Sequence, residues 1–98
     1  MDTEAEFRKA CELAIRGNHE AALDAYEALS STGHIPSQLR LADSYIRGLG
    51  TQADLAAAIK WLEAARDAGS EDAAELLRLA QTFERIEELQ CQWRITGG

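Results

Sequence analysis

The sequence predicts an all-α fold of about five helices, paired as antiparallel helix hairpins. Its 98 residues are rich in Ala and Leu, with one Pro and only 6% aromatic residues, a composition that favours helix over sheet. Apolar residues recur at three- and four-residue spacing in successive stretches, and Gly marks the breaks between them. Parts of this pattern also repeat along the chain, which indicates stacked helical units.

The first helix is expected to begin at Thr3 and to break at Gly17-Asn18. Thr3 and Glu6 have the spacing of a capping box, in which the hydroxyl and the carboxylate each accept a hydrogen bond from a free backbone N–H. The packing stripe of this helix consists of Phe7, Ala10, Cys11, Ala14 and Ile15, so Cys11 is expected to be buried.

A second helix is expected over roughly Glu20 to Ser31, and Gly33 ends it. A third helix follows with Pro36 in its first turn, where the missing N–H costs nothing. The packing residues are Ala22, Leu23, Ala25, Tyr26 and Leu29 in the second helix, and Leu39, Leu41, Ala42, Tyr45 and Ile46 in the third.

The turn at residues 48–50, Gly-Leu-Gly, is expected to need glycine for a positive φ or for a close approach of two backbones. It does not predict a phosphate-binding loop, because it lacks the Lys-Ser/Thr ending and follows no strand. Asp54 then caps a fourth helix that runs to about Ala68, with Gly69 after it.

The fifth helix is expected to be capped by Ser70 and to continue to about Gln92, because no Gly-rich turn follows Phe83. No second helix completes this last pair, so its end serves as a cap or as an interaction arm. Ile86, Leu89 and Trp93 lie on it with no following helix to cover them, and they are the candidates for self-association into a twofold homodimer.

Two alignments within the chain support a repeat. The segment at residues 20–33 aligns on residues 56–69, which places Gly33 and Gly69 at a distance of 36 residues. The segment Leu-Arg-Leu-Ala-x-x-Tyr at residues 39–45 returns as Leu-Arg-Leu-Ala-x-x-Phe at residues 77–83, a distance of 38 residues. A third unit is therefore expected to begin after Ser70.

Residues 37–69 resemble one whole Sel-one-like repeat (SLR), a relative of the tetratricopeptide repeat. The residues that carry the resemblance are Leu41, Ala42, Tyr45, Gly48, Gly50, Asp54, Ala58, Trp61, Ala64, Ala65 and Gly69. The resemblance implies a single domain over residues 1–98, built as a short right-handed α-solenoid with a long C-terminal capping helix. Its units would be a tetratricopeptide-like unit at 3–34, the SLR unit at 35–69, a half-unit at 70–93 and a flexible tail at 94–98.

The resemblance also implies a function by class, because such repeats hold other proteins in a groove lined by the first helix of each unit. The position in the repeat selects Leu39, Asp43, Ile46 and Arg47, and offsets of 31 and 38 residues carry these to the other units. The groove candidates are then Arg8, Glu12, Ile15, Leu39, Asp43, Ile46, Arg47, Leu77, Gln81 and Glu84, with Arg16 and Arg85 beside them. Alternatively, Leu39 and Leu77 pack between units.

The net charge indicates which classes of partner are expected. The net charge of −7 repels phosphate backbones, so no nucleic-acid partner is expected. The negative charge is interpreted as favouring either a basic protein partner or solubility.

Cys11 and Cys91 lie too far apart along a repeat array to form a disulfide, which fits a reducing, cytoplasmic compartment. The sequence shows no signal peptide and no apolar run long enough for a membrane span. The chain is expected to be either a whole small protein or a piece of a longer array.

No catalytic constellation is evident in the sequence. His19 and His34 fall in turns without ligand-spaced partners, and both are expected to be exposed. Acidic pairs such as Glu87-Glu88 are expected to be solvated. We therefore expect no enzyme activity, no cofactor and no metal, and interpret the chain as a protein-binding scaffold or, alternatively, as a self-associating structural unit.

Overall fold

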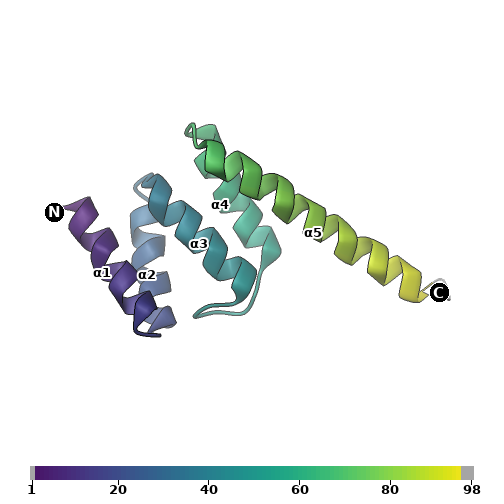
Figure 1. Ribbon diagram of the computed structural model, residues 1–98, viewed down its shortest axis with the longest axis horizontal. Coiled ribbons are helices and arrows are strands. Elements are labelled where there is room, and N and C mark those ends of the chain that lie inside the picture. The colour runs from purple at the N-terminus through teal and green to yellow at the C-terminus, as the bar shows by residue number, and fades with distance from the viewer. Residues whose placement is uncertain (1, 96–98) are drawn as a thin grey trace.

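The computed structural model describes the backbone of residues 2–95 and the side chains of residues 2–89. Within that part of the chain it contains five α-helices and no strand, so the all-α prediction is confirmed (Figure 1). The helices are α1 Thr3–Ile15, α2 His19–Ser30, α3 Ile35–Arg47, α4 Leu55–Asp67 and α5 Glu71–Ile95.

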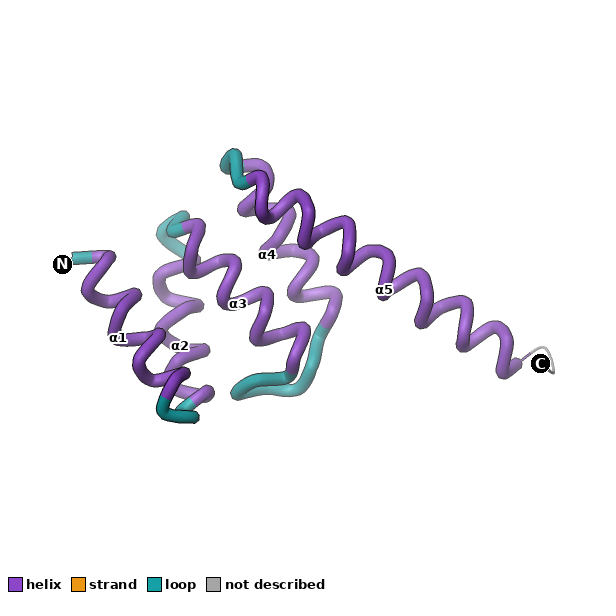
Figure 2. The backbone as a smooth tube through the Cα atoms, in the orientation of Figure 1, coloured by secondary structure: helices purple, strands orange, loops and turns teal. Residues whose placement is uncertain are grey.

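The helices are stacked in the order of the sequence, and each packs mainly on the helix before it and the helix after it. In Figure 1, α1, α3 and the start of α5 lie in front, while α2 and α4 lie behind them. Figure 2 shows that short loops join these helices and that α5 runs on past the body formed by the other four. The molecule is accordingly elongated, with extents of 56 × 30 × 17 Å.

The starts of α4 and α5 are capped as predicted. The carboxylate of Asp54 accepts a hydrogen bond from the Ala57 N–H at 3.1 Å, and the Ser70 hydroxyl accepts one from the Ala73 N–H at 3.1 Å. Each bond satisfies a backbone donor that has no partner inside the first turn. Pro36 occupies the first turn of α3, also as predicted.

The capping box predicted at the start of α1 is wrong. Asp2 occupies the N-cap, and its Oδ1 accepts a hydrogen bond from the Glu4 N–H at 3.1 Å, while Thr3 is already helical. A carboxylate suits this position because it satisfies a free N–H and also carries negative charge at the positive end of the helix dipole.

The far end of α5 also differs from the prediction. The helix continues to Ile95, so the first two residues of the expected flexible tail at 94–98 are helical. Residues 96–98 lie outside the described part of the chain, as do the side chains of Cys91 and Trp93.

Gly50 holds the loop between α3 and α4 against the start of α2. Its φ is 79°, and a Cβ at this position would lie 2.5 Å from the His19 carbonyl oxygen. The loop is also fixed to α3, because the Asp54 N–H donates to the Tyr45 carbonyl at 2.8 Å. Only glycine permits both this φ and this approach, which confirms the predicted close contact of two backbones.

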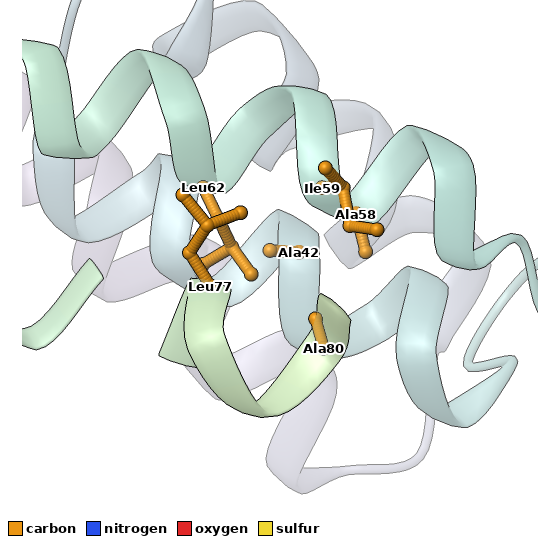
Figure 3. Close-up of a cluster of buried hydrophobic side chains, with 6 residues drawn as sticks. All are labelled: Ala42, Ala58, Ile59, Leu62, Leu77 and Ala80. Carbon is orange, nitrogen blue, oxygen red and sulfur yellow. The ribbon is translucent and has the colours of Figure 1, made fainter. Parts of the chain in front are cut away.

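The core lies between consecutive helices and is built largely from Ala and Leu. One cluster joins α3, α4 and α5 and consists of Ala42, Ala58, Ile59, Leu62, Leu77 and Ala80 (Figure 3). A second cluster joins α1, α2 and α3 and consists of Ala10, Ala22, Leu23, Tyr26 and Leu41. Tyr45 and Trp61 pack against both clusters and so connect them into one interior. Small residues at these contacts allow the helices to approach closely.

His34 is not the exposed turn residue that the sequence predicts, because only 12% of its side chain is accessible. Its Nδ1 lies 2.7 Å from the Ser37 hydroxyl, and its Nε2 lies 3.4 Å from Oε1 of Glu4. Its ring also packs edge-on against Phe7, with 5.1 Å between ring centroids. His34 therefore ties α1 to the start of α3.

Gly50→Ala is expected to destabilise the fold more than Gly17→Ala. Both residues have positive φ, so each variant bears about 1–3 kcal/mol of backbone strain. Only at Gly50 would the new Cβ also meet backbone atoms, because nothing lies within 4 Å of a Cβ at Gly17. Urea denaturation followed by circular dichroism measures both variants. Equal losses in the free energy of unfolding would contradict the close contact between the loop and α2.

Candidate functional site: a groove across α1, α3 and α5

The largest hollow on the described surface lies across the helices that are first in their hairpins. This hollow, called the groove from here on, has a volume of about 690 Å³. Phe7 of α1, Pro36, Leu39, Arg40 and Asp43 of α3, and Asp72, Glu75, Leu76 and Leu79 of α5 line it. A neighbouring side hollow of about 290 Å³ lies between α1, α2 and α3 and shares Arg40 and Asp43 with the groove.

The floor of the groove is apolar. Leu39 is half-buried and packs against the core cluster of α3, α4 and α5, while Leu76 and Leu79 are exposed. Phe7 forms the α1 wall, where Tyr26 and His34 hold its ring at centroid distances of 6.1 Å and 5.1 Å. An open apolar floor of this kind is the type of surface that binds another protein rather than water.

The rim of the groove is mainly acidic. Asp43, Asp72 and Glu75 stand against one guanidinium, that of Arg40. The Asp43 carboxylate already accepts a hydrogen bond from Arg47 at 3.2 Å, an exposed i, i+4 pair of small net stability. Asp72 and Glu75 form no salt bridge with another described residue, although Arg40 lines the groove with them and Arg78 lines a smaller hollow with them.

The side hollow has a different character. The Tyr26 hydroxyl donates a hydrogen bond to the Cys11 sulfur at 3.6 Å. Cys11 is only partly buried, whereas the sequence predicted a buried residue. Burial, together with this hydrogen bond, raises the pKa of Tyr26 from 10.0 to about 12. The phenol therefore stays neutral near pH 7 and serves as a hydrogen-bond donor rather than as a base.

Few of the residues predicted for a groove meet in one place. Leu39 and Asp43 line the groove, whereas Ile15 and Arg47 line the side hollow together with Asp43. The other exposed candidates, which line neither hollow, are Arg8, Glu12, Ile46, Gln81 and Glu84. Leu77 is wrong as a contact residue, because it is only 3% exposed and packs in the core as the alternative interpretation had it.

The candidates predicted on α5 do not line the groove because the offset of 38 residues gives the wrong register. α5 begins 36 residues after α3, and each α3 residue of the groove has its α5 counterpart at that distance: Pro36 and Asp72, Leu39 and Glu75, Arg40 and Leu76, Asp43 and Leu79. The sequence alignment of 38 residues is two positions off, a rotation of about 200° around a helix. The spacing of 36 between Gly33 and Gly69 carries the correct register, and so could have identified Glu75 and Leu79 from Leu39 and Asp43.

The first pair of helices follows the same rule. α3 begins 32 residues after α1, one more than the offset of 31 used to transfer candidates. At 32 residues Leu39 corresponds to Phe7, and both line the groove. At 31 residues it corresponds to Arg8, which the helix turns away from the groove by about 100°.

Neither a metal centre nor a membrane span is formed by the part of the chain that the structure describes. No three His, Cys, Asp or Glu side chains gather there in a way that could hold a metal ion. None of the helices combines the length and the apolar composition that crossing a bilayer requires.

Alkaline pH is expected to destabilise the fold through Tyr26. The pKa of Tyr26 is about 12 in the folded protein and near 10 in the unfolded chain, so its contribution to stability is complete below pH 10 and is lost as pH rises toward 12. Urea denaturation across this range should show a smaller fall in the free energy of unfolding for Tyr26→Phe than for the wild type.

Tyr45→Phe is the matched control for that experiment. The hydrogen bond that the Tyr45 hydroxyl donates to Glu27 at 2.8 Å also raises the pKa of this phenol, so Tyr45→Phe removes the second, smaller part of the fall. Identical pH dependence in the wild type and in Tyr26→Phe would contradict the role given to the buried Tyr26–Cys11 pair.

Comparisons with known proteins identify no relative. No protein-family model, no curated protein and no solved structure matches this chain. The features that bear on function are the apolar floor of the groove, its acidic rim and the helices that form it.

Proposed function

We propose that this domain is a non-enzymatic protein-binding scaffold whose groove holds an amphipathic helix of another protein. The observation that carries the proposal is the open apolar floor, which α3 and α5 form beside the Phe7 wall of α1. A helix laid in such a groove buries its apolar side chains at positions i, i+3, i+4 and i+7, and a few central side chains supply most of the affinity.

The acidic rim favours a partner with basic flanks. Lys or Arg on either side of the apolar stripe of the partner would face Asp72 and Glu75, which form no salt bridge with a described basic residue. The net charge of −7 acts in the same sense, because it accelerates the approach of a basic partner and slows an acidic one. Affinity for such a partner should fall as salt is added.

The proposed architecture behind this site is a short right-handed array of SLR-like helix hairpins. The stacking of consecutive helices and the constant distance of 36 residues between the groove positions of α3 and α5 support it. In such an array every hairpin adds one helix to the same face, so the groove follows from the repeat and needs no special loop. Cytoplasmic localisation stays part of the proposal.

Helical peptides selected on the immobilised domain from a randomised phage library are expected to carry apolar residues at helical spacing with Lys or Arg beside them. Leu76→Glu should weaken the best selected peptide at least about tenfold, because it places a charge on the apolar floor. Fluorescence anisotropy with the synthetic labelled peptide measures the dissociation constant.

Ile46→Glu is the matched control variant. Ile46 is 39% exposed and Leu76 is 40% exposed, both are apolar, and both lie on the first helix of a unit, but only Leu76 lines the groove. Ile46→Glu should leave the dissociation constant within about twofold. Equal weakening by the two variants, or selected peptides without helical apolar spacing, would contradict the assignment of the groove.

A further inference from the structure

Helix α5 has two halves with different surroundings. In the first half, Ala73, Leu77 and Ala80 are buried against α4. After Ala80, every side chain that the structure describes, from Gln81 to Leu89, is exposed. The helix nevertheless continues to Ile95, and Figure 1 shows this half projecting beyond the other helices.

An unsupported half of this length has little stability of its own. The packed first half of α5 supplies the helix nucleus, so the free half, residues 81–95, depends on propagation alone, in which each added hydrogen bond contributes little. Every described side chain of the free half, from Gln81 to Leu89, is exposed, so packing within the chain adds little to its stability. A partner that packs along it would stabilise its helical state.

A second apolar stripe runs along α5 and extends onto this free half. Leu76, Leu79, Phe83 and Ile86 follow one another at steps of three, four and three residues, and Leu89 adjoins them. At 3.6 residues per turn, this stripe lies roughly a quarter to a third of a turn away from the stripe packed on α4. Alternating steps of three and four are the pattern of a coiled-coil seam.

The stripe leaves a large apolar area in water. The exposed fractions are 40% for Leu76, 57% for Leu79, 59% for Phe83, 43% for Ile86 and 57% for Leu89. Together these side chains expose on the order of 500 Å², near the upper range for the largest patch of a monomer. This is more than half of the roughly 800 Å² that each partner buries in a standard stable complex.

We propose that the partner is a second copy of this chain, paired antiparallel through the two α5 helices around a twofold axis near Phe83 and Ile86. The positions that flank this part of the stripe are Ala80, Thr82, Glu87 and Leu89, of which only Glu87 is charged. Charges that flank a coiled-coil seam set the choice and orientation of the partner, and like charges facing each other oppose pairing. Their scarcity here suits two identical helices, and a twofold interface is self-complementary by construction.

The position of the body decides the direction of pairing. The other four helices sit beside the first half of α5 only, as Figure 2 shows. Parallel pairing would bring two bodies to the same end, whereas antiparallel pairing puts each body beside the free half of the other copy. Antiparallel helices also set opposite dipole ends side by side, which is favourable.

Pairing along the whole stripe would also cover Leu76 and Leu79, which line the groove, so pairing and a groove-bound partner would compete for the same side chains. The pairing itself does not depend on the proposed function, since it is measured without any partner.

The oligomeric state of the full chain tests the pairing. Sedimentation equilibrium is expected to show twice the monomer mass of 10.7 kDa at high concentration, falling to the monomer on dilution. Phe83→Glu should give a monomer at every concentration and lower the helical content as the free half frays. Gln81→Glu, which adds the same charge on the opposite side of α5, should stay dimeric. A monomeric wild type, or a dimeric Phe83→Glu, would overturn the proposal.

Spin labels test the direction. Single cysteines replace Glu75 and, separately, Arg85 in a background that carries Cys11→Ala and Cys91→Ala. The two positions lie about 15 Å apart along the helix, so in an antiparallel dimer the distance between the two labels should differ between the variants by up to about 30 Å. Equal label distances at both positions would show parallel pairing and overturn the antiparallel arrangement.

Discussion

The close packing of α4 between α3 and α5 is the contact on which the rest of the structure depends. Ala58, Leu62 and Ala65 of α4 are fully buried, and alanines of α3 and α5 face them. Short side chains let the three helices approach closely and leave few voids. Because α4 holds both neighbours, it sets α3 and α5 side by side on the opposite face. The groove exists only because of that placement, although α4 contributes no residue to it.

Two local restraints keep the hairpins in register. Gly50 lets the loop after α3 touch the backbone at the start of α2, and His34 connects Glu4 of α1 to the first turn of α3. The first restraint acts through shape, since any larger residue would meet the His19 carbonyl. The second also supports Phe7, whose ring forms one wall of the groove. Residues that do not line the groove therefore help to determine whether it is assembled.

Helix α5 contributes both to the core and to the exposed apolar stripe. Its first half supplies Leu77 and Ala80 to the core while Leu76 and Leu79 face the groove. Its second half carries the same apolar stripe beyond the body, where nothing described in the chain covers it. Under the two proposals, binding in the groove and pairing between copies would both use this stripe, and they would share Leu76 and Leu79.

The sequence by itself determined the all-α class, the number of helices, the caps at Asp54 and Ser70, and the need for glycine at Gly50. These features depend on local chemistry: three- and four-residue periodicity, side chains that accept from a free N–H, and a φ that only glycine tolerates without strain. The sequence analysis did not predict the cap at Asp2 or the packing of His34. The first depends on the residue at which α1 begins, and the second depends on a contact between α1 and the start of α3.

Only the tertiary structure decided how far each helix is rotated about its axis, and therefore which residues reach the groove. In α5 both Leu76 and Leu77 are apolar, and periodicity cannot tell which of them faces the core. An offset of 38 residues instead of 36 turns the helix by about 200°, which exchanges the buried face for the face that lines the groove. The choice between the two offsets is made by the packing of Leu77 against α4, which is a contact between distant parts of the chain.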